Sequence, residues 1–299
     1  MTNAVTLASL ANSGYLRNRI INGNMAIDQR NAGASVSTGG TIIYTLDRWY
    51  VGSNGAATTI QRVTGATTNQ YRLQVTGAAG VTNATVSQRI EASNCADMAG
   101  QTVTLSFDAA DSLLTSLTWS ASYANSTDGF GTLTSPTVTS IASGSVTISS
   151  TITRYSVTFA VPIAATTGLV VQFTVGAQTS GTFTLGNVQL ELGTQATPFE
   201  WRPYPIELAL CQRYYQASTM TEYHMVPAPN ATYASTYPVR TSVLMRTLPT
   251  YSFSYVSSFS VGGYTSAISQ GANGYIHFIS ASVSTNAYMQ WNWTASAEL

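Results

Sequence analysis

The acidic side chains give the first test for catalytic chemistry. Asp108 and Asp111 lie three positions apart at the end of a predicted strand. Glycoside hydrolysis requires two carboxyl groups that flank the scissile bond, but a strand continuing through both positions would place them on opposite faces. We therefore expect a turn role or a calcium ligand, although the sequence defines no ligand set for calcium. The prediction is a non-enzymatic protein with no cofactor beyond a possible structural calcium ion.

The histidines and cysteines form no recognisable catalytic or metal motif. His224 and His277 are isolated, and no Gly-x-Ser-x-Gly elbow accompanies them. Cys95 and Cys211 fit neither a disulfide framework nor a zinc site. We expect two buried thiols, with a single bridge as the open alternative. The sequence therefore predicts no catalytic residue and no metal ligand.

Aromatic side chains are the remaining candidates for binding chemistry. Tryptophan and tyrosine combine a large apolar ring with a polar group, which suits them to stacking on sugar rings. Trp119 and Tyr123 share one face of a predicted strand and either line a concave sheet or fill the core. Tyrosine and tryptophan are also dense near the C-terminus, where some must be exposed or lie in a subunit interface. The candidate glycan ligands are Trp119, Tyr123, Tyr255 and Trp291.

The charge content argues against several classes of partner. Only 8% of the residues are charged, the formal net charge is zero, and all 12 basic residues are arginine. Nucleic-acid binders carry a basic patch, which is missing here. No apolar stretch approaches the length of a membrane span, so we expect no membrane insertion. Such an uncharged, Ser/Thr-rich surface is typical of rigid extracellular β-proteins and virion components.

Alternating hydrophobicity predicts an all-β fold. Apolar residues alternate with polar ones in several segments that glycine- or asparagine-rich turns separate, as in half-buried strands of a sandwich or jelly roll. These segments are 71–75, 102–107, 154–161, 171–175 and 183–188. We predict an N-terminal arm over residues 1–17 and a jelly-roll β-sandwich over residues 18–202.

A single helix is predicted to connect this sandwich to a second β-domain. The helix is predicted over Pro205–Gln216, because Pro205 suits a first helical position and apolar residues recur at helical spacing from Ile206 to about Tyr214. The predicted connecting segment is 203–216, and a small C-terminal β-sandwich follows over residues 217–299. Its expected strands are 239–246, 251–256, 275–279 and 288–293. Such a thin core would benefit from oligomerisation.

Two stretches carry a resemblance to a known family. The first runs from Asn18 to Arg30 and continues at residues 44–49; the second comprises residues 186–193, 197–202 and 207–215. Together they resemble a family of virion proteins of tailed bacteriophages, described as tail-fibre or structural proteins. The first domain of such proteins is similar to jelly-roll carbohydrate-binding modules.

The resemblance implies a virion appendage protein on the exterior of the phage particle, a tail fibre or tail-associated protein. It would display its β-domains for adhesion to the host surface, with a glycan as the expected ligand. It implies a homo-oligomer, with a trimer favoured, attached to other virion proteins through the N-terminal arm. The alternatives are a capsid-decorating or head-fibre structural protein and, ranked last, a polysaccharide depolymerase.

The resembling stretches also have a physical interpretation. First and last strands of a jelly roll often pair, so residues 20–27 and 185–192 are expected to lie side by side. Charged side chains are rare in this chain, and we expect those near the domain ends to form ion pairs or hydrogen bonds to backbone. The tryptophans there are expected to be core or seam rings. The predicted structural seam is Asp28, Arg30, Asp47, Arg48, Trp49, Trp201 and Arg202.

Overall fold

The computed structural model of the chain describes residues 16–65, 70–218, 222–226, 232–259, 263–271, 274–282 and 287–299. Side chains are described at 16–65, 70–218, 240–257 and 290–299. The chain divides into two compact units, residues 1–207 with Leu299 and residues 208–298. Most of the predicted N-terminal arm and both histidine side chains lie outside the described residues.

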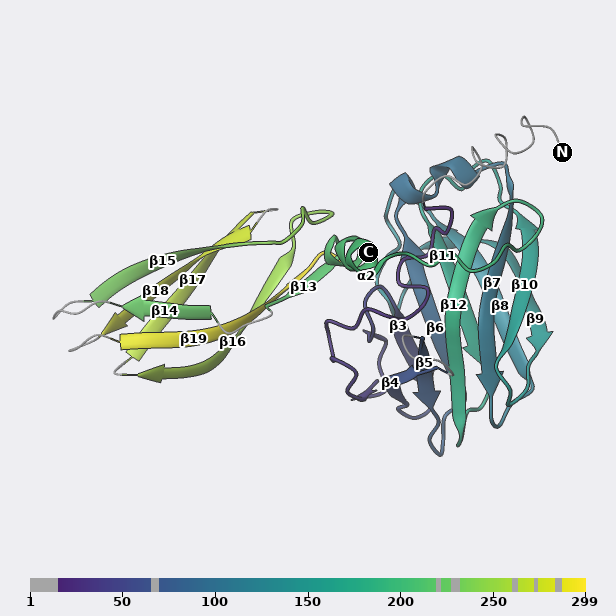
Figure 1. Cartoon of the computed structure of the whole chain (residues 1–299), viewed down its shortest axis with the longest axis horizontal. Coiled ribbons are helices and arrows are strands. Elements are labelled where there is room, and N and C mark those ends of the chain that lie inside the picture. Colours follow the sequence, from purple (N-terminus) through teal and green to yellow (C-terminus); the bar gives the residue numbers. More distant parts are fainter. Residues whose placement is uncertain are drawn as a thin grey trace. The chain divides into compact units, whose positions relative to one another are not determined.

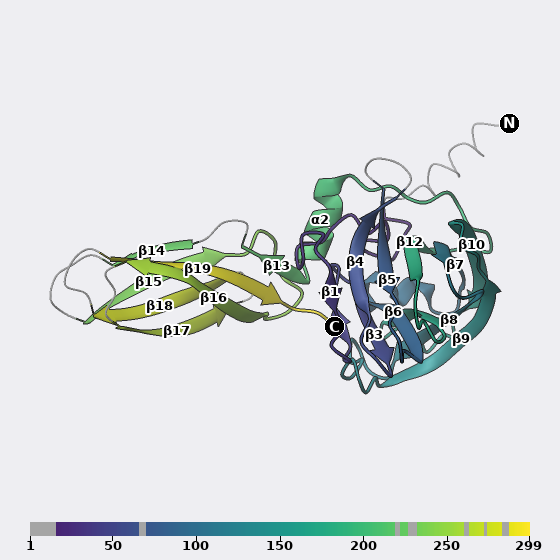
Figure 2. The same cartoon turned by 90° about the horizontal axis from the view of Figure 1, so that it is seen from below.

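The first unit is a sandwich of two antiparallel six-stranded sheets (Figure 1, Figure 2). One sheet has the order β1-β4-β5-β12-β7-β10 and the other β2-β3-β6-β11-β8-β9. The strands of the first sheet are β1 (Val36–Ser37), β4 (Thr59–Thr64), β5 (Tyr71–Thr76), β12 (Thr182–Leu192), β7 (Thr102–Asp111) and β10 (Thr153–Ala160). Those of the second are β2 (Ile43–Tyr44), β3 (Tyr50–Asn54), β6 (Asn83–Ile90), β11 (Leu169–Val175), β8 (Ser116–Ala124) and β9 (Val138–Thr147). Two 3-10 turns, Ala92–Asn94 and Ala96–Met98, follow β6.

The core between the two sheets comes from the predicted alternation. On β11, Val171, Phe173 and Val175 are almost completely buried, and the ring of Phe173 meets that of Phe107 of β7 edge to face, with centroids 4.8 Å apart. Apolar burial of this kind stabilises a fold by about 25 cal/mol per Å². The predicted all-β class with a jelly-roll-like sandwich is confirmed.

The expected pairing of the two ends of the sandwich is also confirmed, although the first segment is not a regular strand. Arg19 donates its backbone N–H to the Leu190 carbonyl at 2.9 Å, and Val188 donates to the Gly23 carbonyl at 2.9 Å. Glycine is required at position 23 because a Cβ there would lie 2.1 Å from the Val188 carbonyl oxygen. Residues 19–23 therefore lie against the last strand of the sandwich.

The helix, α2, spans Tyr204–Gln212 and ends four positions before the predicted Gln216. The chain turns at Arg213 and Tyr214 and enters strand β13 (Tyr215–Ala217), whose pairing with β19 takes these residues out of the helix. Among the described residues, no helix is both long enough and apolar enough to cross a membrane.

The second unit is a small β-structure of two sheets. The first contains β13, β14 (Glu222–Val226), β16 (Thr250–Phe259) and β19 (Ala287–Ser296); the second contains β15 (Thr232–Arg240), β17 (Gly263–Gly271) and β18 (Gly274–Ser282). The prediction of a strand over 239–246 was wrong beyond Arg240, where bends and irregular backbone replace it. Among the described side chains, Met245, Tyr251, Trp293, Ala295 and Ala297 form a buried cluster.

Candidate functional site

A polar groove lies on the outer face of the sheet β2-β3-β6-β11-β8-β9. The same alternation that buries Val171 and Phe173 turns Gln172 outward. Cross-strand register then places Gln172 beside Ser87 of β6 and Ser120 of β8, one side chain per strand across the face. The groove is therefore a direct product of strand parity and register.

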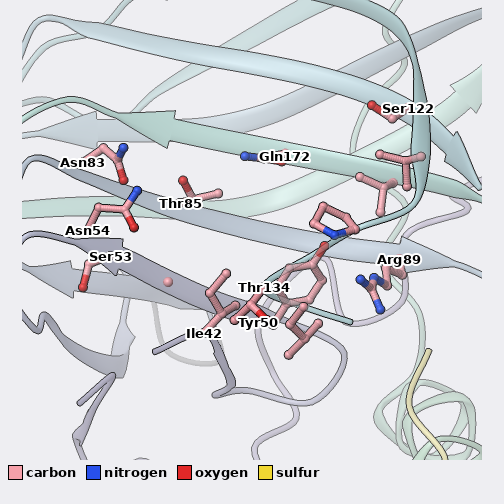
Figure 3. Close-up of a pocket in the computed structure, with 15 residues that line it drawn as sticks. Ile42, Tyr50, Ser53, Asn54, Asn83, Thr85, Arg89, Ser122, Thr134 and Gln172 are labelled. Atoms are coloured by element: carbon pink, nitrogen blue, oxygen red, sulfur yellow. The ribbon is translucent and has the colours of Figure 1, made fainter. Parts of the chain in front are cut away.

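The groove has a volume of about 310 Å³, and neutral polar side chains share its lining with the apolar side chains of Ile42, Leu133, Pro136, Val138 and Val170. Figure 3 shows Asn54, Asn83 and Thr85 close together on neighbouring strands with Gln172 on the next strand, whereas Ser53 points away from them. In the part of the chain that the structure describes, no aspartate or glutamate lines it, and Arg89 is its single cation. The polar lining includes Ser53, Asn54, Asn83, Thr85, Ser122, Thr134 and Gln172.

The amide and hydroxyl groups retain hydrogen-bonding capacity toward a ligand. The Thr85 and Thr174 hydroxyls are 3.2 Å apart, and the Gln172 Nε2 donates to the Thr174 Oγ1 at 3.4 Å. A side-chain amide has two donors and two acceptor lone pairs, so this contact leaves most of the capacity of Gln172 unused. Groups of this type both donate to and accept from sugar hydroxyls.

Arg89 lies at one end of the groove, where its guanidinium is hydrogen-bonded to backbone carbonyls. It is 3% exposed, and its guanidinium donates to the carbonyls of Gly131 and Leu299 at 3.0 and 2.7 Å and to that of Thr132 at 2.9 Å. These bonds hold the segment after β8, which contributes Thr134 to the lining. Arg89 therefore positions the groove wall, and most of its donors are satisfied by backbone.

Tyr50 forms part of the same wall. The Arg89 guanidinium carbon lies 5.6 Å from the centre of its ring, and Tyr44 meets the ring edge to face at 5.5 Å. Burial raises the pKa of the Tyr50 hydroxyl, and the positive charge of Arg89 opposes this rise. The phenol is therefore neutral at ordinary pH and acts through hydrogen bonds. Because the residue is only 8% exposed, it offers little ring surface for stacking.

The aromatic ligands predicted in the first unit do not lie in this groove. Trp119 is 7% exposed, stacks on Phe159 at 5.5 Å, and is covered by Gly144 of β9. Trp119 therefore fills the core, the alternative that the sequence left open, because its strand parity directs it inward. Tyr123 is half-buried and packs against the same core.

The aromatic candidates of the second unit, Tyr255 and Trp291, contact one another. Their rings meet edge to face with centroids 5.5 Å apart. Tyr255 is 44% exposed, whereas Trp291 is only 5% exposed. Tyr255 is thus partly exposed at the surface, and Trp291 is buried beside it.

The predicted seam residues mostly form the expected backbone contacts. Asp28 accepts hydrogen bonds from the backbone of Asn31 and Gly33 at 3.0 and 2.7 Å. Arg202 donates to the carbonyls of Asn18 and Ile20 and pairs with Glu207 at 3.4 Å. These contacts close a local turn and tie the start of the chain to the segment that follows the sandwich.

The remaining charged seam residues, Asp47, Arg48 and Arg30, also contact neighbouring backbone and rings. Asp47 accepts from the backbone and side chain of Gln29 at 2.6 and 2.7 Å, and Arg48, 1% exposed, donates to the Arg89 carbonyl at 2.5 Å. The Arg30 guanidinium carbon lies 5.1 Å from the centre of the Tyr44 ring.

The two seam tryptophans have different environments. Trp49 is fully buried and donates its indole N–H to the Asn22 carbonyl at 2.9 Å. Trp201 is 50% exposed and meets only the edge of Phe199 among the ring contacts described, at 5.3 Å. Trp201 is therefore not a core ring, because half of its side chain is exposed to solvent.

Neither predicted aspartate is arranged for hydrolysis. Asp108 is paired with Arg72 and Arg154, and Asp111 accepts the N–H groups of Leu113 and Leu114 at 2.8 and 2.9 Å. Within the described ranges, no group of three or more His, Cys, Asp or Glu side chains could hold a metal ion. Both cysteines are buried, and neither forms a disulfide bond.

The groove residues had no distinct signal in the sequence. A single asparagine, glutamine or threonine in an alternating strand is the ordinary pattern of a solvent-facing position. Strand parity could have shown that Asn83, Thr85 and Gln172 point outward. It could not have shown that their strands are neighbours.

Comparisons with known proteins find similarity in fold at a distance. No protein-family profile and no curated protein sequence match the chain. A CBM4 structure matches at a TM-score of 0.39 and 16% identity, covering 57% of this chain and 98% of the other. TmCBM61 in complex with β-1,4-galactotriose matches at 0.37 and 9% identity, covering 59% and 99%.

A phage protein is also among the similar structures. The enzymatically active domain of tailspike protein 4 of bacteriophage CBA120 matches at a TM-score of 0.35 and 17% identity. The match covers 59% of this chain but 22% of the tailspike chain. The chain therefore has distant structural similarity, in fold alone, to carbohydrate-binding modules and to part of a tailspike.

Proposed function

We propose that this protein is a non-enzymatic adhesion component of a phage virion appendage, a tail fibre or tail-associated protein, and that the polar groove binds a host-surface glycan. The observation that carries the proposal is the lining of the groove. Neutral amides and hydroxyls on adjacent strands face a common space of about 310 Å³. A sugar has the same kind of surface, with hydroxyls that both donate and accept hydrogen bonds.

The chemistry of the groove favours weak binding of each copy. Each neutral hydrogen bond contributes about 0.5–1.5 kcal/mol after competition with water. Tyr50 presents little of its ring, so stacking adds little. Several copies held together would convert weak contacts into useful avidity. A homotrimer is the assembly that we propose, joined to other virion proteins by the N-terminal arm.

The absence of enzymatic activity is part of the proposal. Among the described residues, no aspartate or glutamate lines the groove. Glycosidases of the usual kind need two such groups near the bond that they cleave. Asp108, the best placed candidate in the sequence, is instead held by two arginines.

Mutation of the groove tests the glycan proposal. Gln172→Ala should weaken binding of a glycan selected on an array about threefold to tenfold, the effect of one neutral hydrogen bond. Thr118→Ala is the matched control, because Thr118 is exposed on the same sheet face but lies outside the groove. The assembled protein should be used throughout. Absence of any glycan binding above background would contradict the proposal.

Labelling of virions tests the proposed location. An antibody against residues 217–299 should mark the tail of particles that contain the protein. Label scattered over the head would instead indicate a capsid-decorating or head-fibre protein, with any glycan contact secondary.

A further inference from the structure

A second pocket lies on the outer face of the opposite sheet, between β4, β5, β7 and β12. Its volume is about 290 Å³. Arg72 is the single charged side chain among the described residues that line it. The hydroxyls of Thr64, Ser112, Ser150 and Thr184 and the amide of Gln74 share the lining with it, and Val63 and Ile152 add apolar surface.

Arg72 reaches its position by crossing a neighbouring strand. It projects from β5, passes over Gly186 of β12, and its Nη2 pairs with the Asp108 carboxylate of β7 at 3.0 Å. A Cβ at position 186 would lie 2.2 Å from the Arg72 Cδ. Glycine is therefore what allows the guanidinium to lie flat across the sheet at the pocket.

The positive charge at this place is incompletely neutralised. Asp108 also pairs with Arg154 at 3.0 Å, so one carboxylate serves two guanidiniums. Asn187 donates a further hydrogen bond to the same carboxylate at 2.7 Å. Asp111, the next acid along β7, does not line the pocket and accepts backbone N–H groups instead. The described charges of the Arg72–Asp108–Arg154 cluster therefore sum to one positive charge.

Arg72 also retains donor capacity. It is 6% exposed, and its Nε is buried with no hydrogen-bond partner among the described residues. Burial lowers the pKa of the guanidinium, the nearby Arg154 lowers it further, and Asp108 offsets this only in part. A buried cation without full compensation is stabilised by an added anion.

We propose that this pocket binds a carboxylate-bearing sugar residue, a uronic acid, as a second glycan subsite on the face opposite the groove. The inference rests on the proposed glycan adhesion and extends it to acidic saccharides. The planar guanidinium matches a carboxylate in shape and hydrogen-bonding pattern. The surrounding hydroxyls and the amide of Gln74 fit the sugar hydroxyls, and the apolar side chains fit its C–H surface.

The test compares an acidic and a neutral oligosaccharide on the assembled full chain. Trigalacturonic acid should bind about tenfold more tightly than galactotriose, as expected for one charge-assisted pair, and added salt should reduce the difference. Thr184→Glu places a carboxylate in the pocket without altering the Arg72–Asp108 pair and should abolish the preference. Thr184→Gln, of similar size and neutral, is the matched control and should keep it.

The outcomes separate this inference from the proposed function. Loss of the acidic preference in Thr184→Glu, with its retention in Thr184→Gln and in the groove variant Gln172→Ala, supports the second subsite. Equal binding of the two sugars, or a preference that Thr184→Glu keeps, overturns the subsite and leaves groove binding intact. Binding of neither sugar, nor of any arrayed glycan, overturns the adhesion proposal and the subsite with it.

Discussion

Asn18 should be one of the most sensitive positions in the sandwich. Its side chain is 4% exposed and satisfies three backbone groups at once. The Oδ1 accepts from the N–H groups of Ile20 and Leu190 at 2.9 and 3.0 Å, and the Nδ2 donates to the Val188 carbonyl at 3.0 Å. One amide thereby joins the first described segment to β12.

Asn18→Ala should destabilise the first unit by about 3 kcal/mol. Each buried group left without a partner costs about 1–3 kcal/mol, and water entering the vacated space would reduce the sum of the three. With a urea m-value of about 3 kcal/mol/M, the unfolding midpoint would fall by about 1 M. The predicted loss of stability is large because three backbone groups lose the one amide that they share, not because apolar contact is lost.

Urea denaturation of the full chain, followed by tryptophan fluorescence, measures the midpoint, and hydrogen exchange of the Leu190 amide gives a local readout. The matched control is Asn125→Ala. Asn125 is exposed, and its Oδ1 accepts from the Thr139 hydroxyl at 2.8 Å, so its removal should change stability by about 0.5 kcal/mol or less. Equal midpoints for the two variants and unchanged exchange at Leu190 would refute the reasoning.

Two further predictions concern buried titratable groups. Burial raises the pKa of the Glu207 carboxyl above its usual value of 4.5, although Arg202 opposes the rise. The stability that the protonated carboxyl contributes is therefore fully present below pH 4.5, and it is lost as the pH rises through the pKa in the folded state. The melting temperature of the wild type relative to Glu207→Gln should thus be higher at pH 4 than at pH 7, and a difference independent of pH would argue against this assignment. Burial raises the pKa of the Cys95 thiol to about 12, and Cys211 is fully buried, so a thiol reagent at pH 8 should label the protein only after unfolding. Rapid labelling of the native protein would show that these thiols are accessible.

The local pattern of the sequence was enough to predict strand positions and strand faces. Segments such as 71–75 and 102–107 alternate strongly, and both became strands whose apolar side is buried. The helix start was also predictable, because Pro205 lies in its first turn. Its end was not, since the switch to β13 depends on pairing with residues near position 295.

The positions of individual rings depended on tertiary contacts. Trp119 and Tyr123 share a strand face, but only the opposing sheet makes that face interior, with Phe159 stacked on Trp119. Trp201 was expected to be a core or seam ring, yet its side chain is 50% exposed. The aromatic content of the sequence alone did not show which rings are buried in the core and which are exposed.

The two pockets were decided by the order of the strands. Asn54, Asn83 and Gln172 come from distant parts of the chain and face one groove because β3, β6 and β11 are neighbours. Likewise, Arg72 meets Asp108 only because β12 lies between β5 and β7 and presents Gly186 beneath the guanidinium. The sequence by itself determined which side chains point away from the core, through strand periodicity. Only the tertiary structure decided which of them meet, because strand order is set by the packing of the whole sandwich rather than by any local pattern.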